Sequence, residues 1–248
     1  MKQRLDLMIV ERGLVDSREK GRRLILAGLV FVNGHPATKP GISYKDDIDI
    51  KLKETARFVS RGGDKFLGAF KAFDLDVKDS ICMDVGSSTG GFTDCMLQHG
   101  AKKVYAVDVG TAQLHYKLRI DDRVVVMEKT NARYFDETSL PEKVDFISID
   151  VSFISLKKIL PAVVKLMKPD AQMVSLIKPQ FEVGRDKIEK GGVVRNHDFR
   201  LEVVDDIIAF GEAECGLKKL GVETSPLKGP KGNVEFLAWW KINKCENS

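Results

Sequence analysis

The segment Ile81-Cys-Met-Asp84-Val-Gly86-Ser-Ser-Thr-Gly90-Gly91-Phe-Thr-Asp94 decides the fold of this chain. Apolar residues alternate over its first five positions, which predicts a buried strand. A glycine-rich turn follows, and a helix is predicted to begin near Gly91. Glycines let the backbone approach a ligand closely, and the N-terminus of the helix offers free N–H groups. The spacing is neither G-x-G-x-x-G nor a P-loop, because Gly86 and Gly90 are four residues apart and no Gly-Lys-Ser/Thr follows.

A second predicted strand, residues 103–109, carries an acid about 20 residues beyond the glycine turn. That acid, Asp108, can accept hydrogen bonds from both ribose hydroxyls of an adenosyl ligand. A third strand at residues 124–127 leads to Asn131, which can meet the adenine. Strand, turn, helix, strand and acid in this order favour an adenosyl site over a purely structural loop. The predicted cofactor contacts are Asp84, Gly86, Ser87, Ser88, Thr89, Gly90, Gly91, Asp108 and Asn131.

The rest of the chain continues to alternate strands and helices. A fourth strand is predicted over residues 144–149 and a helix over residues 155–167, in which Pro161 should introduce a kink or shift the start. There follow a strand at 173–177, a polar glycine-rich loop at 182–196, a helix at 197–214 and strands at 217–223 and 234–242. This order predicts an α/β fold with a mostly parallel, Rossmann-like sheet, helices on both faces and an antiparallel edge.

Polar residues follow the ends of the predicted parallel strands, where ligands bind in such sheets. Asp150 and Lys178 are the two that suggest chemistry, because a lysine at the end of a buried strand needs a partner. Taken alone, the two residues are equally consistent with a structural ion pair and with a lysine poised to accept a proton. Gly86, Asp108 and Asn131 also follow strand ends, so all five residues are predicted to share one rim of the sheet.

The N-terminal quarter of the chain holds the excess positive charge. Residues 1–61 contain 13 Lys and Arg against 8 Asp and Glu, whereas residues 62–248 contain 27 against 28. A helix is predicted over residues 4–12, and a second runs from an N-cap at Asp16 or Ser17 to about Ala27. Short strands at 29–32 and 48–52, with a turn at Asn33-Gly34, complete a small α+β domain.

Basic residues on this small domain favour RNA over an ordinary solvated helix surface, since the charge of the whole chain is skewed toward it. Arginine and lysine would meet phosphates and give affinity without base choice. The candidate RNA contacts are Arg4, Arg18, Lys20, Arg22 and Arg23.

Composition narrows the class of protein further. The four cysteines form no C-x-x-C pair and the four histidines do not cluster with them, which predicts reduced thiols, no metal site and a cytoplasmic protein. The N-terminus is charged at once, so no secretory signal is expected. No apolar run approaches the length of a spanning helix, so stable membrane association is not expected either.

Two resemblances make these expectations specific. Arg22-Arg-Leu-Ile-Leu-Ala-Gly28-Leu-Val-Phe-Val-Asn33-Gly34 resembles the RNA-binding module first described in a small-subunit ribosomal protein and shared by pseudouridine synthases. This resemblance implies that the basic face of the second helix binds structured RNA. The expected division is an RNA-binding module over residues 1–53, a connector over 54–62 and a catalytic domain over 63–248.

Five motifs in order resemble the TlyA family, whose members are rRNA ribose 2′-O-methyltransferases with an FtsJ-like catalytic domain and are often labelled hemolysins. The motifs are Ser60-Arg-Gly-Gly-Asp-Lys65, Asp84-Val-Gly-Ser-Ser-Thr-Gly-Gly-Phe-Thr93, Asp150-Val-Ser-Phe-Ile-Ser-Leu156, Lys178-Pro-Gln-Phe-Glu182 and Gly232-Asn-Val-Glu235. The resemblance implies S-adenosyl-L-methionine as cofactor and rRNA or a ribosomal subunit as partner. It also implies a Lys-Asp-Lys-Glu tetrad at Lys65, Asp150, Lys178 and Glu235.

The implied reaction is an in-line transfer of a methyl group to a ribose 2′-hydroxyl, that of a cytidine. Lys178 would take or stabilise the proton, Asp150 would orient Lys178, and Lys65 and Glu235 would position the nucleotide. Three other readings are a membrane-active hemolysin, an RNA-binding protein without activity and a nicotinamide dehydrogenase. The absence of a spanning segment disfavours the first, the intact motifs disfavour the second, and the glycine spacing disfavours the third.

Overall fold

The chain divides into two compact units, Met1–Ala56 and Arg57–Ser248. A computed structural model describes residues 2–53, 56–184 and 188–243. Residues 54 and 55 of the predicted connector lie outside the described residues, and residues 61 and 62 begin a helix. Each unit has its own hydrophobic core.

The first unit contains two helices and two small sheets. Helices α1 (Leu5–Glu11) and α2 (Arg18–Leu26) pack together. Strand β1 (Lys2–Arg4) pairs antiparallel with β4 (Ser43–Lys45), while β2 (Val30–Val32) lies between β3 (His35–Ala37) and β5 (Ile50–Leu52). Strands β1, β3 and β4 were not expected from the sequence, because three-residue strands leave almost no periodic pattern.

Local chemistry explains these elements. The side chain of Ser17 caps α2, as one of the two predicted N-caps. Asn33 and Gly34 both have positive φ, at 48° and 81°, which is the type I′ turn expected between β2 and β3. Gly21 lets the two helices approach, since a Cβ there would lie 2.6 Å from Ile9 Cδ1. The buried residues Gly21 and Ile25 therefore lie on the packing face of α2.

The second unit is built on a seven-stranded sheet with strand order β11-β12-β10-β9-β6-β7-β8. Strands β10, β9, β6, β7 and β8 pair with one another in parallel. Strand β12 pairs antiparallel with both of its neighbours, β10 and β11. The strands are β6 (Ile81–Val85), β7 (Lys103–Val107), β8 (Val124–Met127), β9 (Val144–Ile149), β10 (Met167–Ile177), β11 (Leu217–Thr224) and β12 (Phe236–Ile242). The predicted parallel sheet with an antiparallel pair is confirmed.

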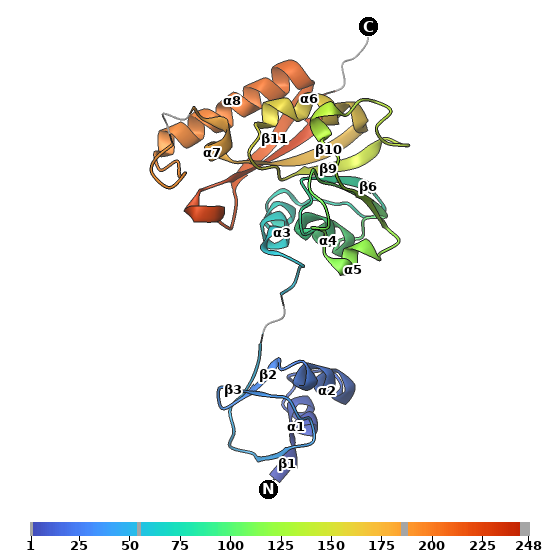
Figure 1. Cartoon of the computed structure of the whole chain (residues 1–248), viewed down its shortest axis with the longest axis vertical. Helices are drawn as coiled ribbons and strands as arrows, with labels where there is room; N and C mark the ends of the chain where they lie inside the picture. Colours follow the sequence, from blue (N-terminus) through green and yellow to red (C-terminus); the bar gives the residue numbers. More distant parts are fainter. Residues whose placement is uncertain (1, 54–55, 185–187, 244–248) are drawn as a thin grey trace. The chain divides into compact units, whose positions relative to one another are not determined.

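Helices cover both faces of this sheet (Figure 1). Helices α3 (Arg61–Phe73) and α4 (Gly91–Gln98) pack on one face over a core rich in phenylalanine. Helices α6 (Leu160–Val163) and α8 (His197–Cys215) pack on the other face over a larger core. The short helices α5 (Tyr116–Arg119) and α7 (Pro179–Glu182) follow β7 and β10. The layered α/β fold predicted from the sequence is confirmed.

The segment around Pro161 departs from the predicted single helix over residues 155–167. Two short 3-10 turns, at Leu156–Lys158 and Val164–Leu166, flank α6, and Pro161 lies in the first turn of α6. Proline has no N–H to donate and cannot continue a helix that starts further upstream, so the element begins anew at this residue. The strand that follows starts at Met167 rather than at residue 173, and its pairing with β9 shifts register between Met167 and Gln172.

The final strand enters the interior of the sheet. Strand β12 lies between β10 and β11, so the predicted terminal pair forms one edge through β11 only. It starts at Phe236 instead of residue 234, which leaves Glu235 in the last position before the strand. That position lies beside the carboxyl end of β10, because Phe236 pairs with Ile177. The chain thereby brings Glu235 next to the residue that follows Ile177.

Candidate active site

Three cavities meet at the carboxyl ends of β6, β9 and β10. We name each after a residue that lines it alone: the Asp108 cavity of about 490 Å³, the Ser60 cavity of about 390 Å³ and the Lys178 cavity of about 470 Å³. Asp150 lines all three. Lys65 lines both the Ser60 and the Lys178 cavities. The rim predicted from strand ends is thus one connected site.

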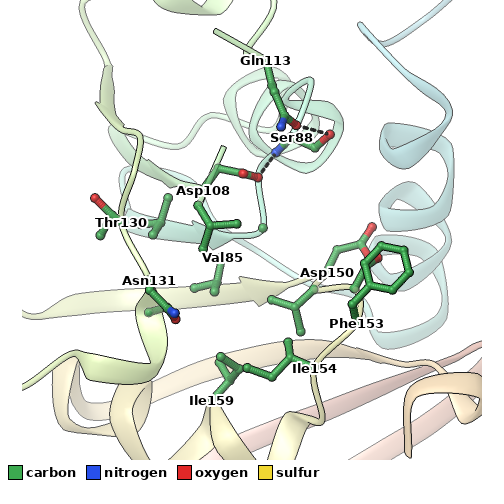
Figure 2. A pocket seen from close by; sticks show the side chains of 16 residues that line it. Val85, Ser88, Asp108, Gln113, Thr130, Asn131, Asp150, Phe153, Ile154 and Ile159 are labelled. Atoms are coloured by element: carbon green, nitrogen blue, oxygen red, sulfur yellow. Dashed lines mark hydrogen bonds between the residues drawn. The ribbon is translucent and has the colours of Figure 1, made fainter. Parts of the chain in front are cut away.

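The Asp108 cavity holds a carboxylate in a fixed direction (Figure 2). Asp108 Oδ2 accepts from Ser88 N at 2.8 Å, and Asp108 Oδ1 accepts from Gly110 N at 2.7 Å. The hydroxyl of Ser88 in turn contacts Gln113 Oε1 at 3.3 Å. A carboxylate oxygen can accept more than one hydrogen bond, so both oxygens of Asp108 remain able to accept from a vicinal diol.

The opposite wall of this cavity is apolar and ends in an amide. Val85, Ile154 and Ile159 line it, and Figure 2 shows them below Asp108, with Asn131 on the far side. Asn131 Oδ1 caps a 3-10 turn by accepting from Arg133 N at 3.1 Å, so its amide nitrogen is the group left to meet a ligand. An apolar slot with a diol acceptor and one amide suits a nucleoside.

The glycines of the turn serve two different purposes. Gly86 has a φ of +83°, and a Cβ there would lie 2.4 Å from Asp150 O, so it allows the turn to touch the loop after β9. A Cβ on Gly90 would lie 2.2 Å from Leu118 Cδ1, and a Cβ on Gly91 would lie 2.4 Å from Ser60 Oγ. Gly90 and Gly91 therefore permit close packing of α4 against its neighbours, whatever they contribute to a ligand.

Asp84 is fully buried and holds the turn to the sheet. Its Oδ2 accepts from Thr93 N at 2.9 Å and Thr93 Oγ1 at 2.6 Å, and its Oδ1 accepts from Ser148 Oγ at 2.9 Å. Burial raises the pKa of Asp84 to about 6, although the hydrogen bonds from Thr93 and Ser148 oppose the shift. Asp84 is also one of the residues that line the Ser60 cavity. Both oxygens of its carboxyl already accept hydrogen bonds from Thr93 and Ser148.

The Ser60 cavity is polar and lies where two helices start. Ser60 is the N-cap of α3 and Gly90 is the N-cap of α4, so backbone N–H groups of both helices face the same space. Cationic side chains from Arg61, Lys65 and Lys228 line it as well. Ser87, Ser88 and Thr89, which were predicted to contact the cofactor, line it too. The cavity suits an anionic group adjoining the nucleoside slot.

The Lys178 cavity contains two buried lysine–carboxylate pairs. Lys178 Nζ lies 2.5 Å from Asp150 Oδ1 and donates to Ser152 Oγ at 2.9 Å. The contact with Asp150 is an ion pair without hydrogen-bond geometry, whereas the contact with Ser152 is a hydrogen bond. Lys178 is 7% exposed and also faces the ring of Phe181 at 6.0 Å. Its ammonium has three donors, so one direction remains for a ligand in the cavity.

The second pair joins the first helix of the unit to its last strand. Lys65 Nζ donates to Glu235 Oε2 at 2.6 Å, and Gln180 Nε2 donates to Glu235 Oε1 at 3.3 Å. Glu235 is completely buried, and a Cβ on Gly229 would lie 2.0 Å from its Oε1. The structure therefore brings Lys65, Asp150, Lys178 and Glu235 to one cavity as two adjacent ion pairs.

Several residues of this cavity were not singled out from the sequence. The loop after β9 and helix α7 are joined by a contact of the Phe153 and Phe181 rings, whose centroids are 5.0 Å apart. They are joined again at Glu182, which accepts from Ser155 Oγ at 2.5 Å and Leu156 N at 2.8 Å. Ser152 stands two residues after Asp150 and lies inside the quoted motif Asp150–Leu156, but no role was predicted for it.

The predicted RNA contacts of the first unit fall into two groups. Arg4 and Arg18 both donate to Asp6, a fully buried carboxylate, at 3.0 Å. The hydrogen bond from Arg4 outweighs burial and lowers the pKa of Asp6 to about 2, with Arg18 adding to the effect. Lys20 pairs with the exposed Asp16 at 2.7 Å. These three cations already have carboxylate partners.

Arg22 and Arg23 differ from the other predicted contacts. No ion pair joins either side chain to another described residue, and both line a shallow cavity of about 340 Å³ with Arg18 and the exposed Leu26. Among the five predicted residues, Arg22 and Arg23 carry the charge most available to a phosphate.

The described residues offer neither a membrane span nor a metal site. In the described part of the chain, no helix is both long and apolar enough to cross a bilayer. Across residues 2–53, 56–184 and 188–243, no group of three or more His, Cys, Asp and Glu side chains could hold a metal ion. Cys82, Cys95 and Cys215 are buried free thiols, and Cys245 lies outside the described residues.

Comparison with known proteins assigns both units. The FtsJ-like methyltransferase family matches residues 58–242, and the S4 domain matches residues 3–45. The chain is 44% identical to the 16S/23S rRNA (cytidine-2'-O)-methyltransferase TlyA of Mycobacterium tuberculosis, over 95% of this chain and 88% of that protein. It is also 44% identical to hemolysin A of Brachyspira hyodysenteriae, over 96% of this chain and 100% of that protein.

A solved structure gives the same answer for the fold. A candidate hemolysin from Streptococcus thermophilus matches with a TM-score of 0.75 and 46% identity, covering 98% of this chain and 89% of that one. The names of these relatives differ, but the family that spans the glycine turn, the three cavities and the two ion pairs is the same. The chain therefore belongs to the TlyA family of FtsJ-like methyltransferases and carries an S4 domain at its N-terminal side.

Proposed function

We propose that this protein transfers a methyl group from S-adenosyl-L-methionine to the 2′-hydroxyl of a cytidine in ribosomal RNA. One observation carries the proposal. Asp150 lines the nucleoside slot, the polar cavity beside it and the cavity that holds the two lysine–carboxylate pairs. A methyl donor and a methyl acceptor bound in these cavities would meet at Asp150. The TlyA protein named above, an rRNA (cytidine-2'-O)-methyltransferase, supports the choice of substrate.

The residues present fit the cofactor. Asp108 would accept from the two ribose hydroxyls and Asn131 would face the adenine, while the methionine carboxylate would meet Arg61 and the two helix N-termini of the Ser60 cavity. Gly86 leaves room that a Cβ would fill. When bound, S-adenosylmethionine supplies a methyl group already activated by a sulfonium.

The chain's own residues then have to align an oxygen and accept its proton. Asp150 and Ser152 hold Lys178 Nζ from two sides, which aims its remaining position into the cavity. To act as a base, Lys178 would first release one ammonium proton, and its neutral amine would then take the proton of the 2′-hydroxyl. The oxygen would bond to the methyl carbon, and the sulfonium would leave as a neutral thioether. Lys65, held by Glu235, faces the same cavity and would bind the adjacent oxygen of the nucleotide.

The S4 domain would supply affinity for RNA through Arg22 and Arg23, with Arg4, Arg18 and Lys20 contributing charge around them. Methylation of rRNA also fits a protein of the cytoplasm with reduced cysteines. In this proposal the first unit holds the ribosomal RNA, and the second unit carries out the chemistry.

The test incubates the purified protein with tritiated S-adenosylmethionine and, separately, with unmodified small and large ribosomal subunits. Label in rRNA is expected with the wild-type chain. Lys178→Ala should lower the rate by about 10²–10⁴-fold, the usual contribution of a general base, without weakening cofactor binding in a calorimetric titration. The matched control is Lys168→Ala, because Lys168 lies on β10, the strand that leads to Lys178, and pairs with Asp145 at 2.9 Å. Lys168 lines none of the three cavities.

Each outcome has a definite reading. Undiminished labelling by Lys178→Ala would remove Lys178 from the reaction. Cofactor binding without label on either subunit would overturn ribosomal RNA as the substrate and leave an RNA-binding role. Leakage of dye from liposomes by the wild-type chain, at the concentrations used for methylation, would favour the hemolysin reading instead.

A further inference from the structure

A short loop at residues 228–233 separates two of the cavities. Lys228 lines the Ser60 cavity, Lys231 lines the Lys178 cavity, and Gly229 lies against Glu235 between them. The loop therefore contributes one lysine to each of the two cavities that Lys65 lines. Neither lysine belongs to the four residues assigned to the reaction.

Hydrogen bonds fix the shape of this loop. Gly229 N donates to Asn233 O at 2.8 Å and Gly232 N donates to Gly229 O at 3.1 Å, which closes a tight turn. Asn233 is 2% exposed, donates from Nδ2 to Gly192 O at 2.9 Å and accepts from Val194 N at 3.1 Å. The backbone that carries both lysines is thus anchored to the neighbouring loop.

Lys231 itself has an unusual backbone conformation. Its φ is +61°, in the left-handed region that side chains with a Cβ rarely adopt, and such conformations concentrate at functional sites. Gly232 follows with a φ of +89°. With this backbone conformation, Lys231 lines the Lys178 cavity.

Around the loop, positively charged side chains outnumber the carboxylates. Within the described residues, the carboxylates of Glu235 and Asp150 are each paired with a lysine of the tetrad. No ion pair joins Lys228 or Lys231 to any residue in the described ranges. Both cavities therefore carry an extra positive charge at the loop, available to an anionic ligand.

We propose that Lys228 and Lys231 bind the two RNA phosphates that flank the target ribose, so that the loop clips the backbone on either side of the reacting nucleotide. The inference rests on the proposed function, because it takes RNA as the ligand. Lysine acts on phosphate as a mobile point charge, which suits a contact that must hold the backbone without reading bases. Gly229, with no side chain, leaves the space between the two contacts free for Glu235.

A second anion could compete for Lys228, since the Ser60 cavity is also where the methionine carboxylate of the cofactor would bind. An RNA phosphate and the methionine carboxylate would give different results in binding experiments. A phosphate contact makes RNA binding depend on salt, whereas a carboxylate contact changes the dissociation constant of the cofactor and leaves RNA binding unchanged.

The experiment uses the full chain with Lys228→Gln, Lys231→Gln and both together. The binding probe is 16S or 23S rRNA transcribed in vitro, titrated at several salt concentrations, with the calorimetric cofactor titration in parallel. The matched control is the double variant Lys218→Gln/Lys219→Gln on the edge strand β11, where both lysines are exposed and line neither cavity. Lys231→Arg tests recovery, because arginine keeps the charge.

Each single substitution should lower the slope of log binding constant against log salt by about 0.7–0.9 and weaken RNA binding about fivefold near physiological salt. The double variant should show about twice the loss of slope, with the cofactor constant unchanged. In methyl transfer, KM should rise and kcat should stay within about twofold. The control should keep the wild-type slope.

An unchanged slope in the double variant, or an equal loss in the control, would overturn the proposal. Weaker cofactor binding with the wild-type salt slope would assign Lys228 to the methionine carboxylate and overturn its phosphate role. Failure of the proposed function looks different, because a wild-type chain that binds RNA without methylating it still reports the salt slopes of all variants.

Discussion

Lys65 and Glu235 are 170 residues apart in the chain, yet Lys65 Nζ donates to Glu235 Oε2 at 2.6 Å in a site where Glu235 has no exposed surface. Removing either partner leaves a buried charge, so Lys65→Met or Glu235→Leu alone should destabilise the fold by about 3–5 kcal/mol. The double variant should recover most of that loss, because no charge is left behind. Urea unfolding of the three variants measures the cycle.

Methyl transfer by the double variant separates structure from function. If the pair positions the nucleotide, the recovered fold should remain inactive while still binding the cofactor. Wild-type turnover in the double variant would mean that Lys65 and Glu235 form a structural pair only.

Gly229→Ala should damage the reaction without removing the cofactor. The new Cβ would lie 2.0 Å from Glu235 Oε1, so Glu235 must move and its bond with Lys65 must lengthen. We expect at least a tenfold loss of methyl transfer, about 1.4 kcal/mol in the barrier, with little change in cofactor affinity. Gly86→Ala is the contrast, because its Cβ would strike Asp150 O at 2.4 Å and its φ of +83° is strained for alanine. That variant should lose cofactor binding as well, and the reverse pattern in the two variants would contradict both assignments.

Asp84 should make the second unit less stable as the pH rises from about 4 to about 6. The folded pKa of Asp84 is about 6, above the unfolded value of 3.8, so the folded state binds more protons in this window and loses that advantage as the carboxyl ionises. A shift of this size corresponds to about 3 kcal/mol of stability. This stability is lost as the pH rises from the unfolded pKa to the folded pKa, and it is absent above the folded pKa. Asp84→Asn can keep the bonds that Thr93 donates, while its amide nitrogen donates to Ser148 Oγ in place of accepting from it, and it should remove this part of the pH dependence. Denaturant unfolding at pH 4.5 and pH 7.5 checks the difference between the two proteins.

Asp6 should have the opposite pH dependence in the first unit. Its pKa is lowered to about 2, so its contribution is complete above the unfolded value near 3.8 and is lost as the pH falls toward 2. Asp6→Asn should destabilise the first unit by about 1–2 kcal/mol at neutral pH, since Arg4 and Arg18 are half exposed and screened by water. Hydrogen exchange over residues 2–53 of the full chain measures it. Asp16→Asn, which removes only the exposed pair with Lys20, should cost less than about 0.5 kcal/mol.

The parallel half of the sheet could be predicted from the sequence because its signals are local. Ile81, Met83 and Val85 alternate, and each later strand ends in a polar residue that the carboxyl-end rule places on a common rim. Asp108 and Asp150 were found in this way, and both line the Asp108 cavity.

The remainder depends on contacts between distant segments, which periodicity does not encode. The antiparallel pairing of β12 with β10 decides the neighbour of Glu235, and no local pattern states it. Strand β10 was also predicted too short, because Pro169 and the positive φ of Asp170 mark an irregular start that reads as a loop. In the first unit Asp6 lies on the apolar side of α1, so its capture of Arg4 and Arg18 could not be read from a count of charges.

Strand β12 is the last strand to be synthesised, yet it lies inside the sheet, between β10 and β11. Translation proceeds at about 5–20 residues per second, so Glu235 is synthesised on the order of ten to thirty seconds after Lys65. Until β12 is synthesised, no strand lies between β10 and β11. Until Glu235 is synthesised, Lys65 lacks its carboxylate partner. A chain cut short before residue 236 would lack an inner strand, with two open edges prone to association in place of an active centre. The candidate active site in this architecture is therefore completed late in synthesis, whereas the first unit, Met1–Ala56, is synthesised at the start.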